Sequence, residues 1–206
     1  MAKVYLIGGV PRCGKTSIAL QAVGKKPMFS TSTDSVRFLL RDVYTYEQMP
    51  ALFDARDKFS ESAVLELYST GRAHEIIDAQ NKESEIVWKA VRRVIDGYLE
   101  EDIDILIEGV AILPSFIATV ECDYKAIFVG NTSPRHAEYM LAHARSGRYD
   151  WLSKRSDESI KAFAKFTNEF SEFFAQEAAK YNMEYVEYGD GDFNEYVAEA
   201  AEKLIN

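Results

Sequence analysis

The sequence has few cysteines and no long run of apolar residues. Two of its 206 residues are cysteine, Cys13 and Cys122, and they lie far apart in the chain. This number and spacing exclude a disulfide framework and a cysteine zinc site, and favour reduced thiols in the cytoplasm. The apolar run near the N-terminus, Val4–Ile7, is far shorter than the roughly 18 residues that a membrane span needs. We therefore expect a soluble, cytoplasmic protein with no membrane partner.

Positive charge is also scarce. The chain has 24 Lys and Arg residues against 33 Asp and Glu residues, which gives a formal net charge of −9. Phosphate backbones and anionic lipid surfaces repel such a chain, so we expect no nucleic-acid partner. A local basic site for a small anion remains compatible with this balance. The five prolines are scattered and no repeat or linker is present, so residues 1–206 are expected to form one domain.

Short apolar runs alternate with amphipathic stretches along the chain. Apolar side chains recur at helical spacing in 81–100 and 157–181, which predicts two long helices, and 193–205 predicts a short final helix. Strands separated by helices imply crossover connections and a parallel sheet covered on both faces, so the predicted fold class is α/β. The expected strands are Val4–Ile7, Met28–Ser30, Ile103–Ile107, Ala126–Val129 and Tyr185–Tyr188.

A glycine-rich loop follows the first expected strand. Residues 9–16 read Gly-Val-Pro-Arg-Cys-Gly-Lys-Thr, which matches the phosphate-loop pattern G-x-x-x-x-G-K-[ST] at every fixed position. Glycines permit a tight backbone that aims successive N–H groups at a phosphate, and the helix that follows adds a positive dipole. We expect Lys15 to contact the β- and γ-phosphates and the Thr16 hydroxyl to ligate Mg²⁺. The expected nucleotide-binding residues are Gly9, Val10, Pro11, Arg12, Cys13, Gly14, Lys15, Thr16 and Ser17.

Acidic residues follow two other strands, at the sheet edge where parallel sheets bind their ligands. Asp34 comes after the second strand, where it can orient an acceptor hydroxyl or accept its proton, and Arg37 one turn later can hold an anionic group. The alternative is that Asp34 only caps the helix beginning there. Glu108 ends the third strand, where it either helps to hold Mg²⁺, through water, or faces the acceptor as a substrate-binding residue. The alternative for Glu108 is a polar strand end before a glycine turn.

Residues 132–155 form a locally basic segment. They hold five basic against two acidic residues, between the fourth strand and the last long helix, where small phosphate-loop kinases carry a lid. Arg145 and Arg148, on either side of a glycine, are the arginines expected to close over the phosphates. The alternative is a solvated helix pair with incidental charge. Residues 43–80 are expected to be a helical insertion over the acceptor site, with Arg72 as a substrate-binding candidate.

Several short motifs accompany the phosphate loop. They are Ser32-Thr33-Asp34-Ser35-Val36-Arg37, Glu85-Ile86-Val87-Trp88, and Ile107-Glu108-Gly109-Val110 followed by Pro114. Over roughly residues 3–120 the chain resembles the 2-phosphoglycerate kinase-like group, and more distantly it is similar to adenylate kinases, shikimate kinases and zeta toxins. The resemblance implies a five-stranded parallel sheet, Mg-ATP as donor, phosphorylation of a small acceptor hydroxyl, and Asp34 and Arg37 on the acceptor side.

Motifs and resemblance together predict a three-layer P-loop NTPase fold with a mostly parallel five-stranded sheet and a helical lid. The expected activity is ATP-dependent phosphoryl transfer to a hydroxyl or phosphate of a small anionic metabolite, with ATP and Mg²⁺ as cofactors. The catalytic candidates are Lys15, Asp34, Arg145 and Arg148. No Asn-Lys-x-Asp tetrad is present, which argues against a GTPase. Three alternatives stay open: a nucleotide-binding regulatory protein without a small-molecule acceptor, a nucleoside monophosphate kinase and a zeta-like toxin kinase.

Overall fold

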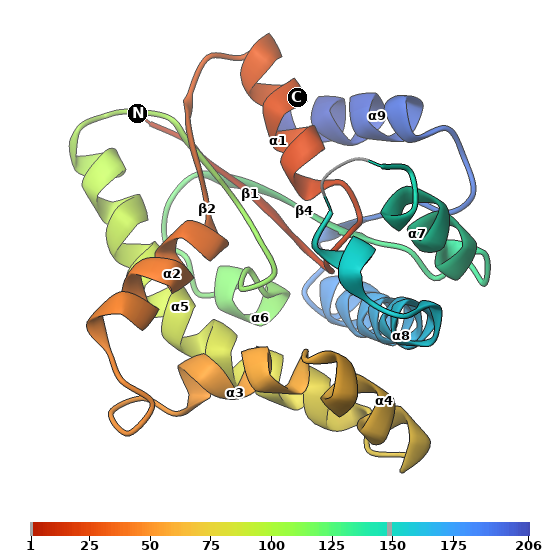
Figure 1. The fold of residues 1–206 in the computed structure, drawn as a ribbon. Helices are drawn as coiled ribbons and strands as arrows, with labels where there is room; N and C mark the ends of the chain where they lie inside the picture. The colour runs from red at the N-terminus through yellow and green to blue at the C-terminus, as the bar shows by residue number, and fades with distance from the viewer. Residues whose placement is uncertain (1, 148–149) are drawn as a thin grey trace.

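A five-stranded sheet forms the centre of the computed structural model, which describes residues 2–147 and 150–206 (Figure 1). The strand order is β2-β3-β1-β4-β5, and every neighbouring pair is parallel. The predicted parallel sheet is therefore confirmed. The strands are β1 (Val4–Gly9), β2 (Phe29–Ser32), β3 (Ile105–Glu108), β4 (Tyr124–Gly130) and β5 (Glu184–Glu187).

Helices cover both faces of this sheet, which gives the expected three layers. Helices α1 and α9 pack side by side over one face, and α8 packs on β4 and β5 from the other (Figure 1). The described helices are α1 (Lys15–Lys25), α2 (Thr33–Val43), α3 (Ala51–Lys58), α4 (Glu61–Ser69), α5 (His74–Glu100), α6 (Pro114–Ile117), α7 (His136–Ala144), the 3₁₀ helix η1 (Trp151–Lys154), α8 (Asp157–Lys180) and α9 (Phe193–Ile205).

The core lies on both sides of β1, because all six residues of this central strand are buried. On one side, a stripe of phenylalanines along α8 packs against β4, and the rings of Phe128 and Phe174 stack with centroids 6.0 Å apart. Phe163, Phe166 and Phe170 of the same stripe are fully buried. The helical spacing that predicted this helix therefore reflects core packing. The packed core fixes the strand ends, at which the functional residues lie.

Two element boundaries differ from those that the sequence predicts. The third strand begins at Ile105 instead of Ile103, since the Asp104 carboxylate accepts a hydrogen bond from the Lys3 backbone N–H at 2.8 Å and pairs with Lys26. These polar contacts leave Ile103 outside the sheet and 42% exposed. Helix α5 begins at His74, well before the predicted residue 81, and the buried polar residue Gln80 interrupts the apolar pattern just ahead of the predicted start.

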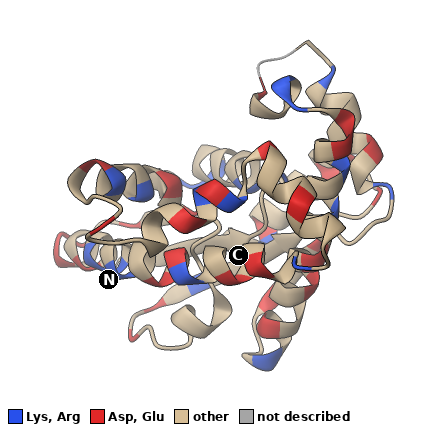
Figure 2. Ribbon diagram, turned by 60° about the horizontal axis from the view of Figure 1, so that its bottom comes forward, with Lys and Arg blue, Asp and Glu red and all other residues tan. Residues whose placement is uncertain are grey.

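The 43–80 and 132–155 segments each fold into short helices beside the sheet. Helices α3 and α4 and the first turns of α5 make up the first segment, while α7 and η1 make up the second. Acidic and basic residues interleave on the outer helices in Figure 2, so the net charge of −9 is not gathered on one helix. Within residues 2–147 and 150–206, no helix is both long and apolar enough to cross a membrane.

Candidate active site at the carboxyl ends of the strands

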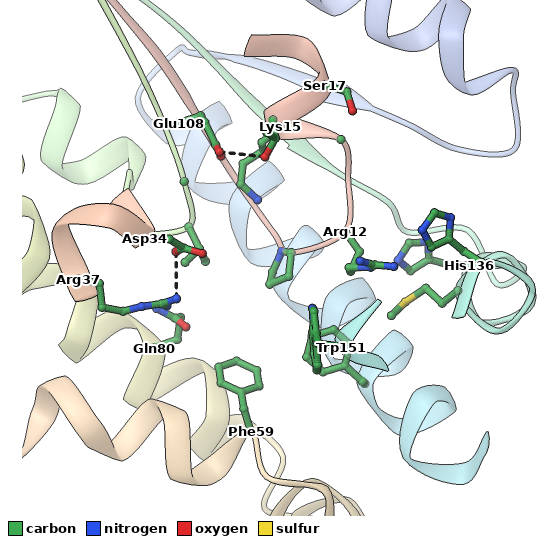
Figure 3. Close-up of a pocket in the computed structure, with 18 of the residues that line it drawn as sticks. Arg12, Lys15, Ser17, Asp34, Arg37, Phe59, Gln80, Glu108, His136 and Trp151 are labelled. Carbon is green, nitrogen blue, oxygen red and sulfur yellow. Dashed lines mark hydrogen bonds and ion pairs between the residues drawn. The ribbon is translucent and has the colours of Figure 1, made fainter. Parts of the chain in front are cut away.

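A pocket of about 950 Å³ opens where β1, β2 and β3 end (Figure 3). One wall is the loop after β1 together with Glu108, and the opposite wall comes from α2, α3 and α5. Helices α7 and α8 close a third side. Charged and polar side chains that line the pocket include those of Arg12, Lys15, Thr16, Asp34, Arg37, Arg41, Arg56, Gln80, Glu83, Glu108, His136 and Arg155. The pocket thus joins the two regions that the sequence assigned to donor and acceptor.

The loop between β1 and α1 has the backbone shape that a phosphate needs. Gly9 has φ +123°, and a Cβ there would lie 2.0 Å from the Val129 carbonyl oxygen, so only glycine fits. Gly14 has φ +79° and precedes α1, which has no side-chain cap. The first N–H groups of α1 therefore have no capping side chain. They are available to an anion in the pocket, whose negative charge the helix dipole would stabilise.

Lys15, Thr16 and Glu108 meet at the base of this loop. The Lys15 ammonium donates a hydrogen bond to the Val10 carbonyl at 2.6 Å, and burial lowers the pKa of Lys15 while Glu108 opposes that shift. The Thr16 hydroxyl donates to Oε1 of Glu108 at 2.9 Å, which places two oxygen ligands together. Oxygen donors suit Mg²⁺. No group of three or more His, Cys, Asp or Glu residues within the described parts of the chain could hold a metal alone, so phosphate and water would complete its coordination.

The middle of the loop is anchored from two directions. Arg12, which has φ +69°, forms an ion pair with the buried carboxylate of Asp150 ahead of η1. Cys13 faces the core instead, and its backbone carbonyl accepts a hydrogen bond from the Tyr196 hydroxyl at 2.9 Å. Burial raises the pKa of the Cys13 thiol to about 12, so this cysteine is a poor nucleophile. Cys13 can therefore contribute only its backbone to the phosphate site.

The acceptor-side residues predicted from the sequence lie on α2. Asp34 and Arg37 pair at 3.1 Å, and both line the pocket (Figure 3). The cap of α2 is Ser32, whose hydroxyl accepts a hydrogen bond from the Ser35 backbone N–H at 3.2 Å. The alternative interpretation of Asp34 as the capping residue is therefore wrong, and its carboxylate is available to the pocket. The Nε of Arg37 is buried without a hydrogen-bond partner.

Sequence reasoning did not identify several residues of the pocket. Arg41, Arg56 and Arg155 bring three further guanidinium groups, and Glu83 is a buried acid among them. Arg41 lies one turn beyond Arg37 on α2, a spacing that could have revealed it. The other residues come from α3, α5 and the end of η1, and their convergence depends on helix packing that no local pattern shows.

His136, at the start of α7, is a further residue that the motifs missed. It is 2% exposed, and neither ring nitrogen has a hydrogen-bond partner. Burial lowers the pKa of His136 to about 4, with Glu187 opposing the shift and Arg12 adding to it. The imidazole therefore lines the pocket as a neutral group with an unused donor and an unused acceptor.

Two arginines expected at the site, Arg72 and Arg145, do not line the pocket. Arg72 binds Glu75 at 2.5 Å and is about half exposed, so its interaction is with the surface of α5. Arg145 donates to the Ser153 and Arg155 carbonyls and to Asp157, which makes it a brace for the chain between α7 and α8. The roles expected of Arg72 and Arg145 therefore stay predictions, whereas Arg12 and Arg155 line the pocket in this structure. Arg148 lies outside the described residues.

The strand, loop and helix, the parallel sheet and the Thr16–Glu108 pair define a P-loop α/β protein. The chain is similar to archaeal proteins named 2-phosphoglycerate kinase. It is 26% identical to the one from Pyrococcus furiosus over 185 residues, which is 89% of this chain and 58% of the relative. With the Methanocaldococcus jannaschii protein it shares 23% identity over 205 residues, 98% of this chain and 62% of the relative. The chain thus spans about three-fifths of these relatives' length.

The chain is also similar to a third 2-phosphoglycerate kinase and to two solved structures. A 2-phosphoglycerate kinase from Methanothermobacter thermautotrophicus is 30% identical over 115 residues, 55% of this chain and 37% of the relative. Dephospho-CoA kinase from Campylobacter jejuni has a TM-score of 0.49 and 13% identity, covering 98% of this chain and 96% of that one. A gluconokinase from Sinorhizobium meliloti 1021 has a TM-score of 0.47 and 11% identity, covering 98% and 91%. No family model matches the chain.

Proposed function

We propose that this chain transfers the γ-phosphoryl group of ATP to a hydroxyl of a small anionic metabolite. One observation carries the proposal: a single pocket has a phosphate loop with the Thr16–Glu108 pair on one wall and Asp34 beside Arg37 on the opposite wall. A donor site and an acceptor site facing each other suit direct transfer, because the reaction requires mainly positioning and electrostatic stabilisation. Similarity to 2-phosphoglycerate kinases makes 2-phosphoglycerate the first acceptor to test.

The donor wall supplies positive charge and N–H groups. In the proposed mechanism, Lys15 and the backbone N–H groups at the start of α1 bind the β- and γ-phosphates. Thr16 and Glu108 would hold Mg²⁺, which would offset the negative charge of the phosphates. The cations of Arg12 and Arg155 flank the space between the walls. A closing movement of residues 132–155 would bring further lid arginines to the same space, and Arg148 stays a proposal of this kind.

The acceptor wall prepares the nucleophile. Asp34 orients the acceptor hydroxyl and takes its proton as the hydroxyl oxygen forms a bond to the γ-phosphorus. The bond between the γ-phosphorus and the bridging oxygen breaks in the same process, and ADP leaves with that oxygen. Arg37 holds an anionic group of the acceptor and keeps Asp34 in place through the 3.1 Å pair. In this proposal residues 1–206 act as one kinase domain, with 43–80 as the acceptor-side insertion.

The decisive experiment measures ADP release with Mg-ATP and a panel of acceptors: 2-phosphoglycerate, glycerate, nucleoside monophosphates and an activated sugar. Lys15→Ala should lower turnover by about 10²–10³-fold, because it removes a charge that stabilises the transferring group. The matched control is Lys25→Ala in the last turn of the same helix, where the side chain pairs with Glu202 on the surface, and it should behave like the wild type.

The panel also separates the rival functions. Turnover with nucleoside monophosphates or the activated sugar alone would favour a nucleotide kinase or a zeta-like toxin kinase. Nucleotide binding without turnover on any acceptor would favour a regulatory protein. Failure of the wild type to bind ATP would refute every function in this class. Full transfer by Asp34→Ala would refute the role given to Asp34.

A further inference from the structure

Glu83 is a carboxylate in an unusual place, on the buried face of α5 behind the acceptor wall. Its side chain is 1% exposed, yet it lines the pocket described above. Burial raises the pKa of Glu83, and the cations of Arg37 and Arg41 oppose that shift. Nothing in the donor site uses this carboxylate. Because an acid so deeply buried is costly unless it is paired, its partners indicate what it does.

Its charged partners are two arginines one turn apart on α2, and Nε2 of Gln80 donates a hydrogen bond to its Oε2 at 3.4 Å. Nη2 of Arg41 donates to Oε1 of Glu83 at 2.7 Å, while its Nε donates to the Leu52 carbonyl at 2.7 Å. Nε of Arg37 lies 3.8 Å from the same carboxylate oxygen, and its Nη2 lies 3.1 Å from Asp34. One oxygen of Glu83 therefore faces both guanidinium groups and limits how they can turn.

The two arginines are only partly satisfied by the protein. Nε of Arg37 is buried and has no hydrogen-bond partner. The same wall also carries Arg56, which is 60% exposed and is paired with Asp57. A buried donor that lacks a hydrogen-bond partner calls for an anion. Guanidinium groups bind phosphate or carboxylate through two parallel hydrogen bonds, provided that their planes are held in place.

We propose that Glu83 is a positioning residue of the acceptor site, which holds Arg37 and Arg41 as a paired clamp for one anionic group of the acceptor. The anionic group is a phosphate or a carboxylate, since both have the geometry that a guanidinium fork recognises. Glu83 itself does not touch the acceptor and acts through the two arginines. This proposal rests on the function proposed above, because it assigns residues to the acceptor half of the same pocket.

The test compares Glu83→Gln with Glu85→Gln, an exposed residue on the same helix that loses the same charge. In Glu83→Gln the KM for the acceptor should rise about tenfold or more, while kcat and the KM for ATP stay within about twofold of wild type. Glu85→Gln should match the wild type in all three constants. A purely structural role for Glu83 would instead change kcat, both KM values and thermal stability together, and that result would overturn the proposal.

A binding measurement makes the test independent of turnover. The protein is saturated with Mg²⁺ and a non-hydrolysable ATP analogue, so that the phosphate loop is filled, and is then titrated calorimetrically with inorganic phosphate or 2-phosphoglycerate. The wild type should bind at least one of the two saturably, and Glu83→Gln should weaken that binding about tenfold. If the wild type binds the analogue but neither anion, this inference is overturned. Failure to bind the analogue would instead refute the proposed function.

A second variant covers the case in which Glu83→Gln does not fold. Arg37→Gln leaves the Glu83–Arg41 pair in place and removes the half of the clamp that has the unpartnered Nε. It should raise the acceptor KM or weaken anion binding about tenfold, with ATP binding unchanged. An Arg37→Gln protein that binds both anions as tightly as the wild type would contradict the paired clamp.

Discussion

At the scale of single residues, His136 shows how burial changes the chemistry of a side chain in the pocket. His136 is the first residue of α7, and its buried ring has no hydrogen-bond partner. Burial lowers its pKa to about 4 from the ordinary 6.5. Between these two pH values the unfolded chain binds a proton that the folded chain does not bind. Folding stability therefore rises with pH across this window and falls as the pH drops from 6.5 to 4.

We expect His136→Phe to remove this part of the acid sensitivity. The titration of His136 accounts for at most about 3 kcal/mol of unfolding free energy, which is lost by pH 4 and fully retained above pH 6.5. Urea unfolding at several pH values would show a flatter pH dependence in the variant than in the wild type. His74→Phe changes an exposed histidine and serves as the control. Equal slopes for His136→Phe and wild type would contradict the assignment.

Single residues could be predicted from the sequence where the function requires a fixed spacing between them. The phosphate loop was predicted correctly in position, since its glycines, Lys15 and Thr16 must follow one another closely to surround a phosphate. Glu83 and Arg41 escaped because their pairing joins α5 to α2 across a gap of 42 positions. Arg72 was predicted as an acceptor-binding residue because it lies in the 43–80 segment, and in the structure it pairs with Glu75, three positions later in the first turn of α5.

At the scale of elements, the phenylalanine stripe of α8 is visible in the sequence, and its contribution to the unfolding free energy can be measured. Phe170 is fully buried and contacts three other rings of the stripe, whereas Phe173 is only partly buried. Phe170→Ala should lower the unfolding free energy by about 3–5 kcal/mol, because it removes a buried ring and leaves a cavity. Urea unfolding would measure this loss, and Phe173→Ala in the same helix should cost clearly less. Equal losses would indicate that burial does not set the contribution of these rings.

The buried faces of the helices explain which helix boundaries could be predicted from the sequence. Helices α8 and α9 each have a mainly apolar buried face, to which α8 also contributes Ser159, Thr167 and Ser171, and their observed bounds agree closely with the predicted 157–181 and 193–205. The predicted helix begins one residue after Gln80, a polar residue on the buried face of α5, where the pattern requires an apolar one. Gln80 lines the pocket, so the residue that breaks the apolar pattern is also a candidate site residue.

At the scale of the whole molecule, the 43–80 segment bridges the two halves of the chain. The Arg155 guanidinium donates to the Phe59 carbonyl, and the Glu61 carboxylate accepts a hydrogen bond from the Ser156 backbone N–H at 2.9 Å. These contacts tie the α3–α4 connection to the start of α8, and α4 packs along α8 in Figure 1. The pocket is thereby enclosed on the side opposite the phosphate loop, so its shape depends on the bridge.

Glu61→Gln should loosen this bridge without disturbing the sheet. The charged acceptor at the start of α8 is lost, so local opening of α4 and of the first turn of α8 becomes easier than global unfolding. Hydrogen–deuterium exchange should become severalfold faster in α4 and around Ser156, while β1 and β3 keep their wild-type protection. Glu66→Gln, an exposed residue on the same helix, is the matched control and should leave exchange unchanged. Faster exchange throughout the sheet would show that the bridge supports the entire fold, and unchanged exchange at α4 would show that packing against α8 holds the insertion without it.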